Sequence, residues 1–177
     1  FHKVIDTVCV TYGTSEGAGV RGSNATIVVP DKTKSKAAQL ANLRTRVEVH
    51  SDDSRLQVKG RLGALTVNAI GEHNVRNALA ACTVGLCLGM KFGQISDGLK
   101  LYDGVQRLQV CGEHKGITVV EDYAHHPTEI ASTLEAVRWV EPKRVIAVFQ
   151  PHLFSRTKFF SSEFAAVLSK FDRAIVT

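Results

Sequence analysis

The sequence predicts an α/β protein made of two parts. In the first part, short stretches with an apolar residue at every second position follow one another closely, which is typical of an antiparallel arrangement of strands. In the second part, runs of β-branched residues alternate with amphipathic stretches, which indicates a parallel sheet covered by helices. The pattern changes at Tyr102-Asp103-Gly104, so the expected domains are residues 1–103 and residues 104–177.

Composition restricts the class of protein. The 177 residues are 44% hydrophobic, which is enough for a buried core, and no apolar run is long enough to cross a membrane. The net charge of +5 is spread along the chain, which favours small anionic ligands over nucleic acid. Four cysteines without metal-type spacing and the absence of an export signal predict reduced thiols and a cytoplasmic protein. Because the chain begins at Phe1, we expect a piece of a longer protein.

The first part contains the shorter predicted elements. Its expected strands are Val4–Tyr12, Ala25–Val29, Arg46–His50, Leu56–Lys59 and Ala64–Ala69. The glycine-rich Thr14–Asn24 is expected to be a loop, and the basic Asp31–Leu43 is either a short helix or a loop. A helix is predicted over residues 71–89, with Asn74 as its N-cap and Gly89 at its end, and a second helix over Phe92–Leu101.

The second part contains the alternating elements. Strands are expected at Leu108–Gly112, Ile117–Glu121, 144–149 and 173–177, and helices from about Pro127 to Trp139 and from near Thr157 to about Lys170. Because they consist mainly of β-branched and other apolar residues, the strands 117–121 and 144–149 are predicted to be fully buried.

Two bends between a strand and a helix carry the polar residues. Asp122, Tyr123 and His125 follow the strand 117–121, and His152 and Arg156 follow the strand 144–149. Ligands of open parallel sheets bind outside the carboxyl ends of the strands, so both bends are expected on one rim. Asp122 could accept hydrogen bonds from ribose hydroxyls, and Arg156 could clamp a carboxylate. The alternative for each bend is a helix start whose polar side chains serve no ligand.

Two further positions are candidates for nucleotide contacts. His73, Asn74 and Asn77 lie at the start of the helix 71–89, where amide side chains could bind a purine edge. The alternative is that Asn74 only caps the helix and His73 is only a polar end residue. Arg107 could reach a phosphate between the domains, or it could lie in solvent.

Other chemistries find little support. The side chains of the adjacent His125 and His126 diverge, and no third ligand has suitable spacing, so we expect no metal site. The sequence contains no G-x-x-x-x-G-K-[ST]. The chain can therefore supply adenine, ribose and carboxylate contacts but no phosphate-binding loop.

Three segments, GEHNVRNALAA, VVEDYAHHPTEI and VFQPHLFSRT, resemble the Mur ligase family in their sequence and order. The segment YGTSEGAGVRGSN is also similar to the central domain of that family. Its members have a UDP-sugar-binding domain, a central P-loop ATPase domain and a Rossmann-like C-terminal domain. The resemblance implies that residues 1–103 are the β-rich end of the central domain and residues 104–177 most of the C-terminal parallel-sheet domain, both incomplete.

The resemblance also implies an activity. It is the ATP-dependent, Mg²⁺-assisted ligation of L-alanine to UDP-N-acetylmuramate through an acyl phosphate, in the cytoplasmic steps of peptidoglycan synthesis. Two alternatives are a related ligase that attaches a recycled murein peptide to UDP-N-acetylmuramate and a non-catalytic nucleotide- or UDP-sugar-binding module. Because the P-loop and the UDP-binding domain are absent from this sequence, we expect the chain alone to be inactive and the Mg²⁺ ligands to lie mostly outside it.

The motifs of the family imply a role for each matching residue. The nucleotide-binding residues are His73, Asn74 and Asn77 on the adenine side, Arg107 near the phosphates and Asp122 at the ribose. The residues at the muramyl and amino-acid end are Tyr123, His125, His152 and Arg156. Their expected role is positioning and charge stabilisation rather than proton transfer. The sequence departs from the family at Gln106-Arg107-Leu108, which keeps one arginine of two, and at Leu153, where many relatives carry arginine.

Overall fold

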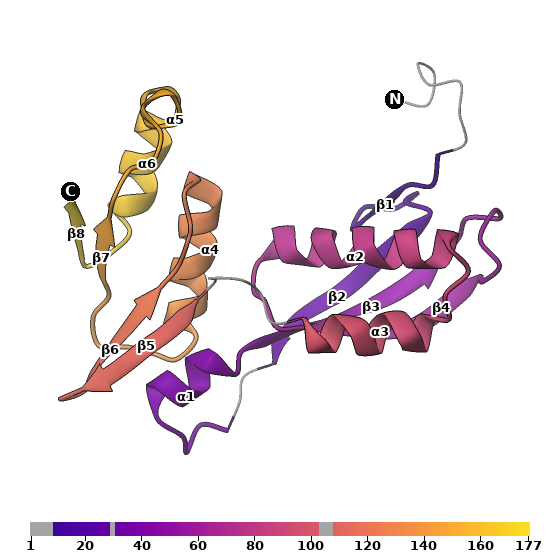
Figure 1. The fold of residues 1–177 in the computed structure, drawn as a ribbon, viewed down its shortest axis with the longest axis horizontal. Coiled ribbons are helices and arrows are strands. Elements are labelled where there is room, and N and C mark those ends of the chain that lie inside the picture. The colour runs from indigo at the N-terminus through magenta and orange to yellow at the C-terminus, as the bar shows by residue number, and fades with distance from the viewer. Residues whose placement is uncertain (1–8, 29–30, 103–107) are drawn as a thin grey trace. The chain divides into compact units, whose positions relative to one another are not determined.

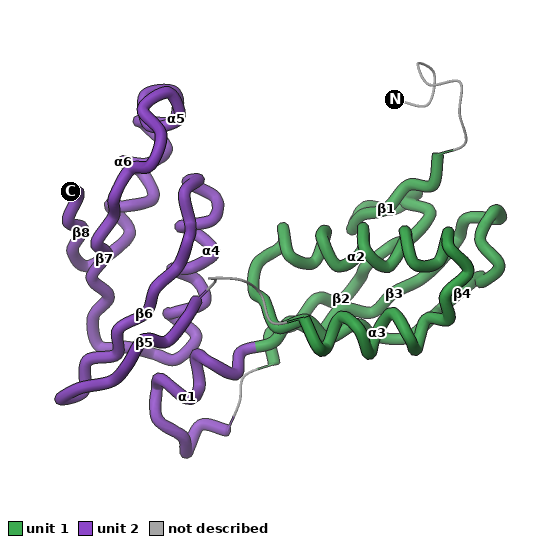
Figure 2. The backbone as a smooth tube through the Cα atoms, in the orientation of Figure 1, with its two compact units in different colours: residues 1–28, 44–103 green, residues 29–43, 104–177 purple. Residues whose placement is uncertain are grey.

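The computed structural model describes residues 9–28, 31–102 and 108–177 (Figure 1). These residues form two compact units (Figure 2). Unit 1 extends to Val28 and resumes over Arg44–Asp103, whereas unit 2 combines Val29–Leu43 with Gly104–Thr177. The units differ from the predicted domains in one segment. Residues 29–43 connect two paired strands of unit 1 but belong to unit 2. The assignment of residues 1–103 and 104–177 to two domains of the family stays a prediction.

Unit 1 is a four-stranded sheet with the order β1-β2-β3-β4. Its strands are β1 (Tyr12–Gly13), β2 (Val20–Val28), β3 (Arg44–Ser51) and β4 (Gly60–Val67). The pairs β2–β3 and β3–β4 are antiparallel, as the sequence predicts, and the short β1 pairs parallel to β2. Two helices, α2 (Glu72–Cys87) and α3 (Phe92–Leu101), pack on the apolar face of this sheet.

Alternation along the strands explains why the helices cover only one face. Val47 and Val49 of β3 are fully buried against Leu79 of α2, and Cys82 lies in the same core. Burial raises the pKa of the Cys82 thiol to about 11, so the thiol is neutral at physiological pH. The intervening residues of β3 are polar, and Glu48 Oε1 lies 2.9 Å from Arg46 Nη1 on the other face.

The predicted elements of unit 1 are correct in type more often than in extent. Of the expected strand Val4–Tyr12, the described residues 9–12 include only Tyr12 in a strand. The strand β2 begins inside the expected loop Thr14–Asn24. The expected strand Leu56–Lys59 is wrong: Leu56 is buried, but its N–H donates to Asp53 O at 3.2 Å in a turn.

The two ends of α2 show one wrong and one correct prediction. The N-cap is Gly71, at φ 101°, and not Asn74, which lies in the first turn and donates its side-chain amide to Ile70 O at 2.8 Å. The end at Gly89 is confirmed. Gly89 has φ 76° and donates to Leu86 O, and Met90 N–H donates to Gly85 O, both at 3.0 Å, which is a Schellman motif.

Unit 2 begins with the helix α1 (Lys36–Ala41), which decides the two alternatives for residues 31–43. Ser35 Oγ caps it by accepting from Ala38 N at 3.2 Å. Lys36 Nζ donates to Val140 O, and Lys32 Nζ lies 3.8 Å from Glu141 Oε1. These contacts join the segment to the remainder of unit 2, although it lies between two strands of unit 1 in the sequence.

The remainder of unit 2 is mixed α/β, which confirms the predicted class. The elements in order are β5 (Gln109–His114), β6 (Ile117–Glu121), α4 (Pro127–Arg138), β7 (Ile146–Phe149), α5 (Phe154–Phe159), α6 (Ser161–Leu168) and β8 (Arg173–Val176). The strands β7 and β8 are parallel, as expected, and β5 and β6 form an antiparallel hairpin. Lys115 and Gly116, with φ 48° and 75°, form its two-residue turn, which a parallel connection does not allow.

The prediction of fully buried strands in unit 2 is wrong. Ile117 and Val119 of β6 are 68% and 56% exposed, and Val148 of β7 is 71% exposed. The alternate residues of these strands face inward. One of them, Phe149, packs against Phe164 of α6 with ring centroids 5.2 Å apart. These strands are therefore covered on one face in the described structure.

Candidate functional site

Asp122 holds the start of the first bend together. Its Oδ1 accepts from Ala124 N–H at 2.8 Å, and its Oδ2 accepts from Leu108 N–H at 2.8 Å. Leu108 has φ 48° and precedes β5, so the carboxylate joins the entry of β5 to the exit of β6. A carboxylate offers about four acceptor positions, so both bonds are compatible with further bonds to hydroxyl groups.

His125 is fixed by three neighbouring groups. Its backbone N–H donates to Glu129 Oε2 at 2.9 Å, and its ring Nδ1 lies 2.9 Å from Tyr123 O. The same Glu129 oxygen lies 3.6 Å from Nδ1. The Tyr123 ring meets the His125 ring edge-on at 5.0 Å. The bend therefore presents an ordered aromatic and imidazole pair.

The helix α4 starts as its sequence predicts. His126 is the N-cap, and its ring Nδ1 accepts from Thr128 N–H at 3.3 Å. Pro127 occupies the first helical position, where its missing N–H costs no hydrogen bond. The ring of His126 also packs edge-on against Phe160 at 4.6 Å. His126 thus has a structural role at the start of the helix.

Arg156 connects the two bends. It lies in α5, after β7, and its Nη1 donates to His125 O at 3.5 Å. With the contact between His126 and Phe160, this bond shows that the two bends are neighbours. The expected single rim is wrong, because among the described residues β6 pairs only with β5 and β7 only with β8, in two separate two-stranded sheets. The arginine side chain lies partly buried beside the Tyr123–His125 pair, where it could receive an anionic group.

The remaining predicted site residues differ in their surroundings. His152 is exposed between β7 and α5. In unit 1, His73 and Asn74 are partly buried in the first turn of α2 and Asn77 is exposed in the next turn. Arg107 lies outside the described residues. The approach of the α2 start to the two bends is a relation between the units and stays a prediction.

Sequence reasoning missed Glu129. The predicted helix from about Pro127 contains this residue but gives it no role, yet its carboxylate organises His125. A glutamate three residues after an N-cap is the pattern of a capping box, and this spacing could have indicated a carboxylate that reaches back across the bend.

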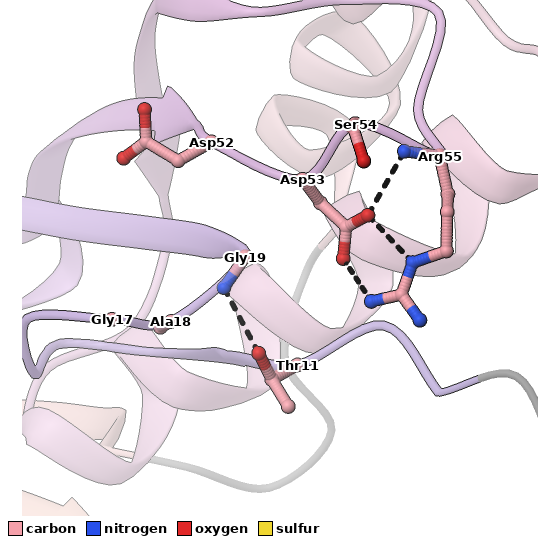
Figure 3. A pocket seen from close by; sticks show the side chains of 8 residues that line it. All are labelled: Thr11, Gly17, Ala18, Gly19, Asp52, Asp53, Ser54 and Arg55. Carbon is pink, nitrogen blue, oxygen red and sulfur yellow. Dashed lines mark hydrogen bonds and ion pairs between the residues drawn. The ribbon is translucent and has the colours of Figure 1, made fainter.

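Unit 1 contains a separate polar pocket of about 360 Å³ (Figure 3). It is lined by Thr11, Gly17, Ala18, Gly19, Asp52, Asp53, Ser54 and Arg55. The Asp53 carboxylate accepts from Arg55 Nε at 2.7 Å, and a Cβ on Gly19 would lie 2.9 Å from its Oδ2. Thr11 Oγ1 accepts from Gly19 N–H at 2.9 Å. Asp52 N–H donates to Gly19 O at 2.9 Å and joins the two loops. No predicted site residue lines the pocket.

Neither a metal cluster nor a membrane span is found in the described parts of the chain. Across residues 9–28, 31–102 and 108–177, no three His, Cys, Asp or Glu side chains are grouped so that they could hold a metal ion. Within the same ranges, no helix combines the length and the apolar character that crossing a membrane requires.

The sequence is similar to those of known proteins. Residues 106–177 match the family described as Mur ligase, glutamate ligase domain. The chain is 43% identical over 171 residues to the UDP-N-acetylmuramate–L-alanine ligase of Salinibacter ruber, covering 95% of this chain and 32% of that protein. It is 49% identical over 119 residues to the protein of the same name from Desulfotalea psychrophila, covering 66% and 26%. The chain thus spans about a third of the length of the curated relatives that it matches.

Solved structures give the same fold. A UDP-N-acetylmuramate-alanine ligase from Thermotoga maritima superposes with a TM-score of 0.65 at 24% identity, covering 94% of this chain and 33% of that one. A UDP-N-acetylmuramoylalanyl-D-glutamyl-2,6-diaminopimelate–D-alanyl-D-alanyl ligase from Acinetobacter baumannii also has a TM-score of 0.65, at 18% identity, covering 93% and 32%. These structures share the fold, and the sequence matches show that the chain belongs to the Mur ligase family.

Proposed function

We propose that the chain is part of an ATP-dependent ligase that joins L-alanine to UDP-N-acetylmuramate in cytoplasmic peptidoglycan synthesis. The main support is the 43% identity, over 95% of this chain, to a curated protein of that name. In the proposed reaction, ATP phosphorylates the muramyl carboxylate. The amino group of alanine then attacks the acyl phosphate, an amide forms and phosphate leaves. The activity is proposed for the longer protein, to which this chain contributes two groups of binding residues.

The bends of unit 2 are proposed to bind the amino-acid end. The Arg156 guanidinium would pair with a substrate carboxylate, since its planar fork matches two carboxylate oxygens. Tyr123, His125 and His152 would lie around the reacting carbonyl and amine. Their contribution is orientation, because holding two reactants in the right geometry removes much of the entropic cost of a bimolecular step.

The nucleotide is proposed to contact both units. His73, Asn74 and Asn77 would lie on the adenine side, Asp122 would accept from the ribose hydroxyls, and Arg107 would bind the phosphates. The surroundings of the Asp122 carboxylate fit this role. The group is half-buried, and the two backbone N–H groups that donate to it fix its orientation as an acceptor. Mg²⁺ would offset the charge of the phosphates, and its ligands are expected outside these residues.

The substrate preference tests the function. We expect the full-length protein to release phosphate from ATP with Mg²⁺ and UDP-N-acetylmuramate only when an acceptor is added, with L-alanine preferred over a murein tripeptide by at least about 100-fold in kcat/KM. Such a ratio corresponds to about 2.7 kcal/mol of differential binding. A preference for the tripeptide would instead identify the related ligase that attaches recycled peptide. Binding of ATP without turnover would identify a binding module.

Asp122→Ala in the full-length protein is expected to weaken binding of a non-hydrolysable ATP analogue about 10-fold, because hydrogen bonds to a charged acceptor contribute about 1.5–3 kcal/mol. Isothermal titration calorimetry measures this change. The matched control is Glu121→Ala, which removes the exposed neighbouring carboxylate. Thermal unfolding of both variants is measured alongside, since Asp122 also bonds two backbone amides. A folded Asp122→Ala protein with unchanged affinity would remove the ribose role.

A further inference from the structure

We propose that Glu129 is a positioning residue that fixes the protonation pattern of the His125 ring, so that the first bend presents a hydrogen-bond acceptor to the amine of an α-amino acid. The assignment of the amino acid to this bend depends on the proposed function. The action of Glu129 on His125 depends only on the local geometry.

The ring nitrogen Nδ1 faces two acceptors. Tyr123 O lies 2.9 Å from it and Glu129 Oε2 lies 3.6 Å from it. A carbonyl oxygen and an ionised carboxylate accept hydrogen bonds and donate none, so Nδ1 must carry the hydrogen. In a neutral imidazole the other nitrogen, Nε2, then carries the lone pair. The surroundings of Nδ1 therefore select the tautomer whose Nε2 is an acceptor.

The same glutamate oxygen also fixes the backbone at this position. Glu129 Oε2 accepts the N–H of His125 at 2.9 Å, so a single carboxylate holds both the main chain and the ring. Glu129 lies in the first turn of α4, where a negative charge is favoured by the helix dipole. Its side chain is 20% exposed and that of His125 is 32% exposed, so solvent screens this arrangement only in part.

The second half of the arrangement comes from Arg156. Its Nη1 donates to His125 O at 3.5 Å, so the guanidinium is joined to the residue whose ring Glu129 orients. The two neighbouring bends together then combine an acceptor, Nε2 of His125, with a donor, the Arg156 fork. An α-amino acid carries the complementary pair, an amine that donates and a carboxylate that accepts. An α-amino acid is therefore the substrate class that these groups would select.

The matched test is Glu129→Gln. Glutamine keeps the volume and one oxygen that can accept from His125 N–H, but its NH₂ group donates, and it favours a lone pair on Nδ1. Long-range ¹H–¹⁵N NMR of the ¹⁵N-labelled chain, which has seven histidines, reports the tautomer of each ring. We expect the neutral wild-type ring of His125 to carry its hydrogen on Nδ1, and E129Q to increase the Nε2–H population several-fold. Glu135→Gln, an exposed position on the same helix, is the control and should change nothing.

Kinetics of the full-length protein complete the test. E129Q should raise the KM for L-alanine about 10-fold, leave the KM for ATP unchanged and leave the thermal midpoint within the range of the control. A wild-type ring with its hydrogen on Nε2, or an E129Q ring that does not change, would overturn the inference whatever the activity. A tautomer shift in a protein that ligates no alanine would overturn the proposed function and establish the action of Glu129 on His125.

Discussion

Leu79→Ala is expected to lower the free energy of unfolding of unit 1 by about 3–5 kcal/mol, the cost of removing a large side chain from a core that cannot collapse around the gap. Leu79 is fully buried, and its methyl groups lie directly on the backbone of β2. A Cβ built on Gly22 would come within 2.8 Å of Leu79 Cδ1, so glycine at that position is what lets the leucine approach the sheet.

Chemical denaturation followed by far-ultraviolet circular dichroism measures this loss. Leu88→Ala is the matched control, because Leu88 ends the same helix but is 75% exposed. Its effect should stay within about 0.5 kcal/mol, as for other surface substitutions. Equal losses in the two variants would show that Leu79 does not hold α2 on the sheet.

Arg156→Ala is expected to raise the KM for L-alanine about 100-fold in the full-length enzyme. The loss of a bidentate, charge-assisted pair with the substrate carboxylate accounts for about 2.7 kcal/mol of that change. The substitution also removes the bond to His125 O, so it disturbs the acceptor and the donor of the bend together. Steady-state kinetics at saturating ATP and UDP-N-acetylmuramate separate KM from kcat.

Two variants control this experiment. Lys158→Ala removes another positive charge from the same short helix, at an exposed position, and should leave the KM unchanged. Arg156→Lys keeps the charge but not the planar fork, so an intermediate KM is expected. If Lys158→Ala weakens alanine binding as much as Arg156→Ala does, general electrostatic attraction replaces the proposed clamp.

Much of the fold could be predicted because local patterns determine it. The helix 92–101 was predicted at its observed bounds, and Gly89 marked the end of α2 because only a positive φ completes that motif. Burial of the strands was not predictable in the same way. β-Branched residues favour a strand, but they do not reveal whether its second face is covered, and Val119 and Val148 are exposed. The N-cap prediction at Asn74 failed because Gly71, with φ 101°, occupies the N-cap position, so the helix begins before Asn74.

The candidate site was predictable in its order and not in its internal bonds. The order of strands and helices placed Asp122, His125 and Arg156 at consecutive bends, and the bond from Arg156 to His125 O brings these bends together. The spacing of Glu129 from the N-cap could indicate a carboxylate that reaches back, but its contact with the His125 ring depends on the conformation of the bend. The hydrogen bond from Leu108 to Asp122 likewise joins residues 14 positions apart, through a hairpin whose register the sequence leaves open.

The exposed apolar side of β7 and β8 has a consequence for how copies of the chain behave together. Ile146, Val148 and Ile175 lie on one side of these strands and present a surface that could pair with another molecule. Lys143, Arg144 and Arg173, all exposed, place three positive charges where the two strands begin, since Ile146 pairs with Arg173. Like charges at this end repel an approaching second chain, and added salt screens them over about 10 Å at 0.1 M. We therefore expect the solubility of this unit to fall as the ionic strength rises.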